Sequence, residues 1–138
     1  MFAVPANTVA LPAALGHPAR IALDVARDRG RWADLLRYDP DERFATLVDA
    51  TGDVEIWLLT WLPGQHTDLH HHAGSAGAFT VVSGVLTETV GAIEHLVTVG
   101  RTRVFGPGYV HRVRNLGTDP VASIHVYRPE RAHSTVER

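Results

Sequence analysis

Three consecutive histidines, His70, His71 and His72, are the side chains of this sequence best suited to chemistry. Residues two apart in a β-strand point to the same face, so His70 and His72 would present two imidazoles to one space while His71 points away. Neutral imidazoles held on rigid elements are good ligands for a divalent metal ion. A third imidazole is expected from His111, which follows the turn at 106–108 and opens a strand. The pattern predicts a metal site with His70, His72 and His111 as ligands.

Three of the nine histidines in the chain are expected to have structural roles. His17, His95 and His133 stand alone, and a lone histidine is usually a surface or hydrogen-bonded core residue. His66 lies in the loop before the triplet, close enough in sequence to approach the site. Whether His66 or His71 has any part in the chemistry stays open at this point.

The composition predicts a soluble globular protein without a nucleic-acid or membrane partner. Hydrophobic residues make up 45% of the 138 residues and the net charge is −2, so a basic surface for DNA, RNA or anionic lipid is not expected. The absence of cysteine excludes disulfides, zinc–thiolate sites and a cysteine nucleophile, and it fits a reducing cytosol. Pro5, Pro12 and the lack of a basic start argue against a signal peptide, and no apolar run approaches the roughly 20 residues of a membrane helix. We therefore expect a cytoplasmic protein.

The elements that must position the histidines are predominantly strands. Helical spacing of apolar residues predicts one or two helices over 18–38, closed by Pro40. Short β-rich segments separated by turn residues follow, at 44–48, 54–62, 78–82, 85–90, 95–99, 101–105, 110–114 and 121–127. Regularly spaced strands of this kind indicate an all-β sandwich or barrel. The sequence predicts a single domain over 1–138, with a helical lead-in over about 1–40, a β-barrel over about 42–128 and a frayed tail over 129–138.

Two stretches around the histidines resemble the two motifs of the cupin superfamily. Gly64, five further residues and His70-x-His72, with Gly84 beyond, resemble the first motif. The segment PGYVH at 107–111, followed by Asn115, resembles the second. Cupins are small β-barrels of the jelly-roll type with the metal inside the barrel. The resemblance implies such a barrel here, with a short N-terminal helical segment.

A narrower resemblance, to the cysteine dioxygenase (thiol dioxygenase) family, spans about 47–129. In most cupins three or four residues separate the second histidine from a glutamate ligand. The corresponding positions in this chain are Ala76 and Gly77. A neutral site of three histidines is typical of the thiol dioxygenases. Their C-terminal signature is a Ser-x-His-x-Tyr strand, which matches Ser123, His125 and Tyr127 here.

The resemblance implies an Fe(II) enzyme that adds both atoms of dioxygen to the sulfur of a small thiol such as L-cysteine, giving a sulfinic acid. Tyr127 would donate a hydrogen bond at the metal, with His125 orienting Tyr127 and Ser123 orienting His125. Trp61 on the adjoining strand would wall the pocket, as Trp57 also could. The expected partners are the thiol substrate and dioxygen, and the expected role is bacterial thiol oxidation and cysteine metabolism.

Three positions depart from the family pattern. In mammalian members a cysteine can crosslink to the tyrosine, whereas this chain has Gly77 at that position, as many bacterial members do. An arginine before the metal motif binds the substrate carboxylate in the family, and the matching residue here is Ala45 or Thr46. Arg43, two residues from Ala45 on the same strand face, is the candidate replacement. The middle residue of the triplet, often aspartate in the family, is His71.

Two other functional classes remain open on the sequence. A different metal-dependent cupin enzyme, an isomerase or a dioxygenase acting on a non-thiol substrate, would keep the three histidines without needing the Ser-x-His-x-Tyr strand. A non-enzymatic ligand-binding cupin would hold another metal or none, and would consume no oxygen with any thiol. The sequence leaves the identity of the thiol and the oligomeric state undetermined.

Overall fold

The computed structural model describes residues 16–67, 70–71, 76–106 and 108–128. One α-helix, α1 (Pro18–Arg27), and two 3₁₀ turns, η1 (Arg29–Arg31) and η2 (Ala33–Leu35), precede the strands. The strands are β1 (Phe44–Thr51), β2 (Val54–Trp61), β3 (His70–His71), β4 (Ala76–Ser83), β5 (Leu86–Val90), β6 (Ile93–Val97), β7 (Thr102–Phe105), β8 (Val110–Arg114) and β9 (Val121–Arg128). The predicted helical region and strand series are thus confirmed, with the second half of the helical region formed by 3₁₀ turns.

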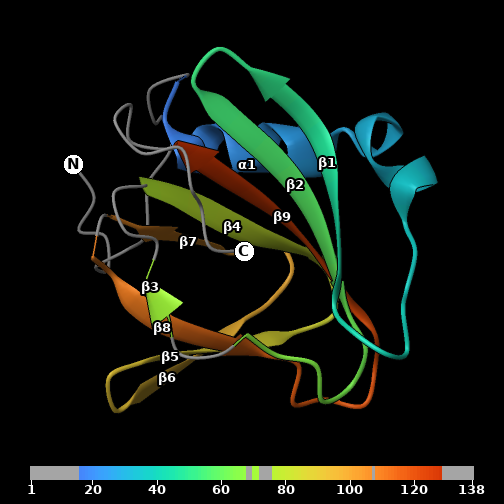
Figure 1. Ribbon diagram of the computed structural model, residues 1–138, viewed down its shortest axis with the longest axis vertical. Coiled ribbons are helices and arrows are strands. Elements are labelled where there is room, and N and C mark those ends of the chain that lie inside the picture. Colours follow the sequence, from blue (N-terminus) through green and yellow to red (C-terminus); the bar gives the residue numbers. More distant parts are fainter. Residues whose placement is uncertain (1–15, 68–69, 72–75, 107, 129–138) are drawn as a thin grey trace.

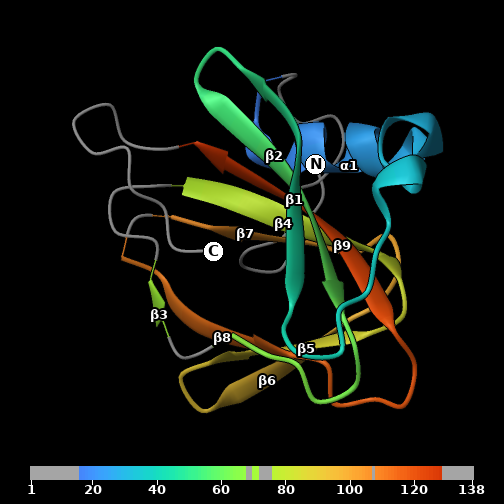
Figure 2. The ribbon, with the colours of Figure 1, turned by 45° about the vertical axis from the view of Figure 1, so that its right-hand side comes forward.

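The strands form two sheets that face each other (Figure 1). The larger sheet has the order β1-β2-β9-β4-β7 and the smaller one β3-β8-β5-β6. Neighbouring strands in both sheets are antiparallel, and several neighbours are distant in sequence. Figure 2 shows the same two layers after rotation, with α1 on the outer face of the larger sheet. This is the all-β barrel that the strand pattern predicts.

The helix covers one face of the larger sheet because its apolar residues lie on one side. Pro18 occupies its first turn, and the Nδ1 atom of His17 accepts a hydrogen bond from the backbone N–H of Ala19 at 3.0 Å. Ala22 and Val25 are buried against the outer side chains of β2 and β9, which include Leu58. His17 therefore has the structural role expected for a lone histidine. No helix in the described ranges is long and apolar enough to cross a membrane.

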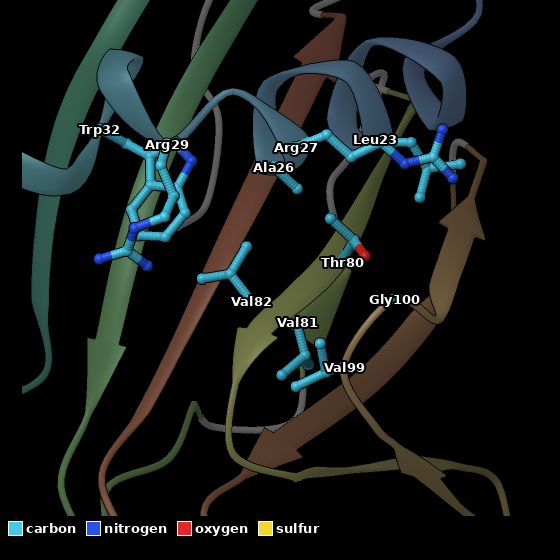
Figure 3. Close-up of a pocket in the computed structure, with 10 residues that line it drawn as sticks. All are labelled: Leu23, Ala26, Arg27, Arg29, Trp32, Thr80, Val81, Val82, Val99 and Gly100. Atoms are coloured by element: carbon cyan, nitrogen blue, oxygen red, sulfur yellow. The ribbon is translucent and has the colours of Figure 1, made fainter.

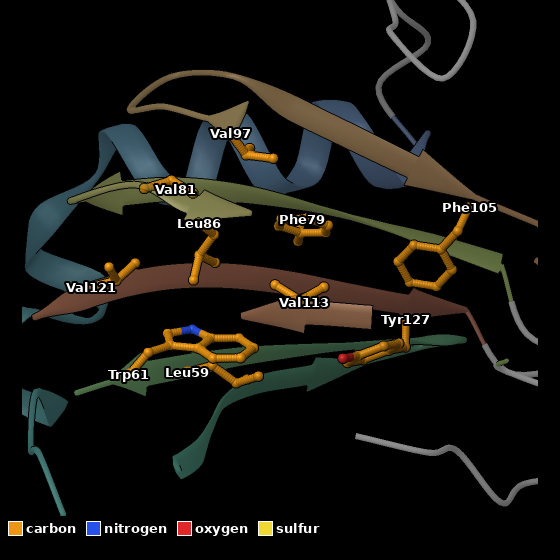
Figure 4. Packing of buried hydrophobic residues seen from close by; sticks show 10 residues of the cluster. All are labelled: Leu59, Trp61, Phe79, Val81, Leu86, Val97, Phe105, Val113, Val121 and Tyr127. Atoms are coloured by element: carbon orange, nitrogen blue, oxygen red, sulfur yellow. The ribbon is translucent and has the colours of Figure 1, made fainter. Parts of the chain in front are cut away.

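Successive side chains of β9 point alternately to the two faces of the larger sheet. Ala122, Ile124 and Val126 belong to the cluster under α1. Val121 and Tyr127 belong to the second cluster, which fills the space between the sheets (Figure 4). Its buried members are Leu59, Trp61, Phe79, Val81, Leu86, Val97, Phe105, Val113, Val121 and Tyr127. The inner face of the barrel therefore carries the odd-numbered residues of β9.

Candidate metal centre and active site

His111 is buried on the inner face of β8. The turn before it needs Gly108 at φ 79°, a conformation that residues with a side chain rarely adopt. His111 is only 3% exposed, and its ring packs against Phe105 and Tyr109, with ring centroids 5.6 Å and 5.4 Å away. Its Nδ1 atom lies 2.8 Å from Oε2 of Glu88. The imidazole is thus held by packing on two sides and by one short hydrogen bond.

Glu88, in the middle of β5, is fully buried and is the residue of this site that the sequence analysis missed. Its Oε1 atom accepts a hydrogen bond from Nε–H of Arg103 at 2.6 Å. Burial by itself raises the pKa of Glu88, but the hydrogen bonds from His111 and Arg103 and their charges outweigh it, so the pKa lies below its ordinary value. An ionised carboxylate only accepts hydrogen bonds, so Nδ1 of His111 is the donor, and in the neutral ring the lone pair is on Nε2.

The backbone of the histidine triplet reaches the same part of the barrel. β3 pairs with β8 so that His70 lies directly opposite His111 and His71 opposite Val110. His72 lies outside the described residues, as does the placement of the His70 side chain. Among the side chains that are described, no three of His, Cys, Asp or Glu are grouped to hold a metal. The set of His70, His72 and His111 therefore stays a prediction, and the register of β3 with β8 is compatible with it.

The chemistry of His111 fits a divalent metal ion. A metal-ligating histidine typically donates its other ring N–H to a carboxylate or carbonyl, which fixes the tautomer and the ring orientation. His111 makes this bond to Glu88, with Nε2 as the nitrogen that carries the lone pair. The residues present are thus suited to the neutral histidine site that the sequence predicts.

Ser123, His125 and Tyr127 share the inner face of β9, as the strand period predicts. Ser123 and His125 are buried, and Tyr127 is 2% exposed. Oγ of Ser123 lies 2.7 Å from Nε2 of His125, and the rings of His125 and Tyr127 are nearly parallel with centroids 6.3 Å apart. The ring of Phe79 also stacks on that of His125, with centroids 5.0 Å apart. The three polar side chains therefore follow one another along the inner face of β9, with Ser123 and His125 joined by a hydrogen bond.

Trp61 extends this line at its buried end. Its indole Nε1–H donates to Oγ of Ser123 at 2.9 Å. A buried hydroxyl proton needs an acceptor, and in the described part of the chain Nε2 of His125 is the acceptor that Ser123 has. Ser123 therefore donates to His125, whose own proton is then on Nδ1. The orienting of His125 by Ser123 is supported by this geometry, and Trp61 is part of the same chain rather than only a wall.

Phe105 links the two halves of the site. Its ring lies 5.6 Å from that of His111 and 5.9 Å from that of Tyr127, measured between centroids. The candidate ligand on the smaller sheet and the tyrosine on the larger sheet therefore pack on the same aromatic ring inside the barrel.

Arg43 places a cation inside the barrel, next to the line from Trp61 to Tyr127. The guanidinium carbon lies 5.0 Å from the ring centroid of Trp61. Burial lowers the pKa of Arg43, and an electrostatic interaction with Tyr127 acts in the opposite direction. An arginine keeps its charge at neutral pH even when it is partly buried. Ala45 is exposed and Thr46 half-buried, and neither carries a charge. Arg43, the residue just before β1, is the one that brings a positive charge to Trp61.

Gly77 lies opposite Tyr127 in the pairing of β4 with β9. A β-carbon at this position would overlap the carbonyl oxygen of Val126 and the ring of Phe105. The aromatic ring that contacts both His111 and Tyr127 thus occupies the space that a larger residue at Gly77 would need.

We expect Gly77→Ala to destabilise the protein by about 1–3 kcal/mol, the usual cost of overpacking a filled core. Urea denaturation measures this loss. Gly117→Ala is the matched control, because a β-carbon there would meet only Asn115 Oδ1 at an ordinary 3.6 Å, and its effect is expected to stay within about 0.5 kcal/mol. Equal stability of the two variants would contradict the close packing of Phe105 over Gly77.

Of two other residues that the sequence raised, His66 lies in an exposed loop and Trp57 on the inner face of the larger sheet, opposite His125. His66 is exposed, and its Nδ1 atom contacts the carbonyl oxygen of Thr67 at 3.0 Å, so its place is in the loop. Trp57 is half-buried on β2 and donates through Nε1–H to Glu55 Oε1 at 3.1 Å. It packs against the inner cluster, in agreement with a partly structural role.

A pocket of about 330 Å³ lies on the other side of the larger sheet, between α1 and β4 (Figure 3). Its lining includes Arg27, Arg29 and Trp32, with the Arg29 guanidinium 4.9 Å from the Trp32 ring. The hydroxyl of Thr80 in this pocket donates to the carbonyl of Arg101. No lining residue is a histidine, cysteine, aspartate or glutamate. This pocket lacks the side chains of a metal centre, so the candidate site is the barrel interior.

Two facing antiparallel sheets enclose a buried histidine from the smaller sheet and a hydrogen-bonded polar face of β9 from the larger one, as expected for a protein of the cupin superfamily. The family model for cysteine dioxygenase type I matches residues 19–96, more than half of the chain. The chain therefore belongs to the cysteine dioxygenase type I family. The matched region includes the histidine triplet and Glu88, and it ends before His111 and β9.

Solved structures support the fold. A protein from Thermus thermophilus is 29% identical with a TM-score of 0.66, over 70% of this chain and 92% of that one. An uncharacterised protein with a double-stranded β-helix domain from Klebsiella pneumoniae is 24% identical with a TM-score of 0.66, over 77% and 93%. A cupin superfamily protein from Desulfitobacterium hafniense is 11% identical with a TM-score of 0.63, over 72% and 89%. A comparison with curated proteins finds no match.

Proposed function

We propose that this protein is a non-haem iron thiol dioxygenase. It would convert a small thiol and one dioxygen molecule to a sulfinic acid. Both oxygen atoms would end bonded to sulfur, and no proton would be consumed or released overall. Membership of the cysteine dioxygenase type I family supports the reaction class. The observation that carries the proposal is the buried line of Trp61, Ser123, His125 and Tyr127, which meets Phe105 and His111 in the barrel interior. An ordinary core strand has no need of this polar face.

The metal in this proposal is Fe(II), held by His70, His72 and His111. Bound iron would supply the reactivity toward dioxygen and a positive charge that favours the thiolate form of the substrate. The protein holds Nδ1 of His111 with Glu88. The buried apolar side chains of Leu59, Phe79 and Phe105 line the same interior and exclude water from it.

The polar residues of the barrel interior would bind the substrate, donate a hydrogen bond to it and orient one another. Arg43 would bind a carboxylate of the substrate, because it brings a positive charge to the interior beside Trp61. Tyr127 would donate its phenolic proton in a hydrogen bond to oxygen where negative charge develops. His125, whose ring stacks beside that of Tyr127, would keep the tyrosine in place. Ser123, which is hydrogen-bonded to His125 and to Trp61, would hold His125 in one tautomer. The substrate class that fits these groups is a small mercapto acid such as cysteine.

The proposed ligand set predicts about one iron per chain and its loss when a ligand is removed. His111→Ala should lower the iron content, because two remaining ligands hold a divalent ion poorly. His71→Ala is the matched control within the triplet and should keep nearly full iron content. Metal analysis of the purified variants measures both. Full occupancy in His111→Ala would refute this ligand set, and loss in His71→Ala would place the strand register one residue away.

An oxygen-electrode screen of the iron-loaded protein against a panel of small thiols tests the reaction. Oxygen uptake matched by sulfinate formation is the expected result. Iron binding without oxygen uptake for any thiol would instead favour a different cupin enzyme or a ligand-binding cupin.

A further inference from the structure

The two oxygen atoms of the buried Glu88 carboxylate accept hydrogen bonds from residues of two different strands. Oε1 accepts from Arg103 on β7 at 2.6 Å, and Oε2 accepts from His111 on β8 at 2.8 Å. Arg103 uses Nε for this bond, while its NH2 group lies 3.4 Å from the hydroxyl of Tyr109. The carboxylate is therefore not closed into a two-point pair with the arginine. Its Oε2 atom accepts from His111 at 2.8 Å and, at a longer 3.5 Å, from the hydroxyl of Tyr109.

We propose that Glu88 is a positioning residue of the metal centre, which keeps the proton of His111 on Nδ1 and presents Nε2 to the metal, with Arg103 holding the carboxylate in place. This inference rests on the proposed function, because it takes His111 as a metal ligand. Glu88 itself contacts neither the metal nor the substrate in this assignment.

The position of Glu88 on a rigid element suits this role. It lies at the centre of β5, where it pairs with His95 on β6 and with Val113 on β8. Val113 is two residues from His111 on the same strand. A group that sets the direction of an imidazole must itself be fixed to a fraction of an ångström, and a central strand paired on both sides provides this.

Stability alone does not explain a charged group at this place. A buried ion pair often contributes no more to folding than apolar residues of the same volume would. The inner cluster supplies apolar neighbours to either side, Leu86 on the same strand and Val113 opposite. The hydrogen bond that Glu88 accepts from His111 gives a functional reason for a charged residue at this position.

Glu88→Gln is the test variant, because the amide cannot serve both neighbours. If its oxygen accepts from His111, its NH2 group faces a donor of Arg103. If the side-chain amide adopts the flipped orientation, its NH2 group faces Nδ1 of His111, and the ring proton must then be on Nε2. Competition with a coloured chelator for Fe(II), without oxygen, measures the metal affinity of each variant.

The expected result is a loss of about tenfold in Fe(II) affinity, at the low end of the 10–100-fold range for such partners. Glu94→Gln is the matched control, because it makes the same change in an exposed carboxylate of the neighbouring strand β6 that pairs with Arg114. Its Fe(II) affinity should stay within about twofold of the wild-type value. A folded Glu88→Gln protein with wild-type affinity would overturn the proposal, and so would an equal loss in Glu94→Gln.

A second measurement needs no variant at position 88. The long-range ¹H–¹⁵N NMR spectrum of the metal-free wild-type protein reports the tautomer of His111, assigned with His111→Gln. A proton on Nδ1 supports the proposal, and a proton on Nε2 overturns it, even where Glu88→Gln fails to fold. Failure of the wild-type protein to bind Fe(II) would instead refute the proposed function, whatever the tautomer.

Discussion

Tyr127→Phe should keep its iron and most of its substrate binding while kcat falls about 10²–10³-fold. The phenol is buried among Phe105 and His125, and phenylalanine fills the same space, so the core packing should survive. One hydrogen bond aimed at developing charge in a water-excluded site is worth about 2.7–4 kcal/mol, which corresponds to this loss. A fall in kcat with KM nearly unchanged is the sign of an interaction made in the transition state.

The neighbouring variants test whether the strand works as one unit. His125→Ala should give a smaller loss of kcat, because it acts through Tyr127. The losses in the double variant should not add, since the two residues share one function. Tyr38→Phe is the matched control, because Tyr38 is 40% exposed and belongs to neither core cluster. Unchanged oxygen uptake and sulfinate yield in Tyr127→Phe would make β9 an ordinary strand face and favour another cupin function.

The face of β9 could be predicted from sequence because one strand carries the whole pattern. Ser123, His125 and Tyr127 are two residues apart, and the alternating Ile124 and Val126 are the apolar residues that the helix covers. A period of two fixes both faces at once when each is buried against a different partner. The place of His111 in a strand after a turn was also predicted from local sequence, whereas its burial is known from the structure.

Glu88 could not be chosen with the same certainty, because its partners come from distant strands. The strand period does place Glu88 on the side of the buried Leu86, and that signal could have drawn attention to it. A glutamate in a strand is usually solvated, and only the pairing of β5 with β8 and the side chains of Arg103 and His111 make its burial favourable. No local pattern in the sequence contains these contacts.

The case of Arg43 is similar. The resemblance to the family directs attention to Ala45 or Thr46, neither of which carries a charge. The long side chain two residues earlier does so because it starts beside β1 and packs its guanidinium over Trp61. The ligands His70 and His72, by contrast, remain predictions from spacing.

Arg43→Met should raise KM about 10–100-fold for thiols that carry a carboxylate. Methionine keeps apolar packing on Trp61 and removes the charge, so a lost charge-assisted hydrogen bond of about 1.5–3 kcal/mol is the expected effect. Steady-state oxygen uptake with cysteine and 3-mercaptopropionate measures it. Arg43→Lys should recover part of the loss, because a lysine supplies charge without the planar pair of donors.

Two controls separate the loss of charge from general damage to the barrel. Cysteamine has the thiol and the amine of cysteine without its carboxylate, so whatever rate it supports should be nearly the same in the wild-type and Arg43→Met proteins. Arg37→Met removes a charge from an exposed arginine whose carbonyl, not its side chain, receives the hydroxyl of Thr60. Its KM for the mercapto acids should match that of the wild type. If cysteine is used with a low-micromolar KM that survives Arg43→Met or Arg43→Ala, the carboxylate is bound by another group and the proposed role of Arg43 is wrong.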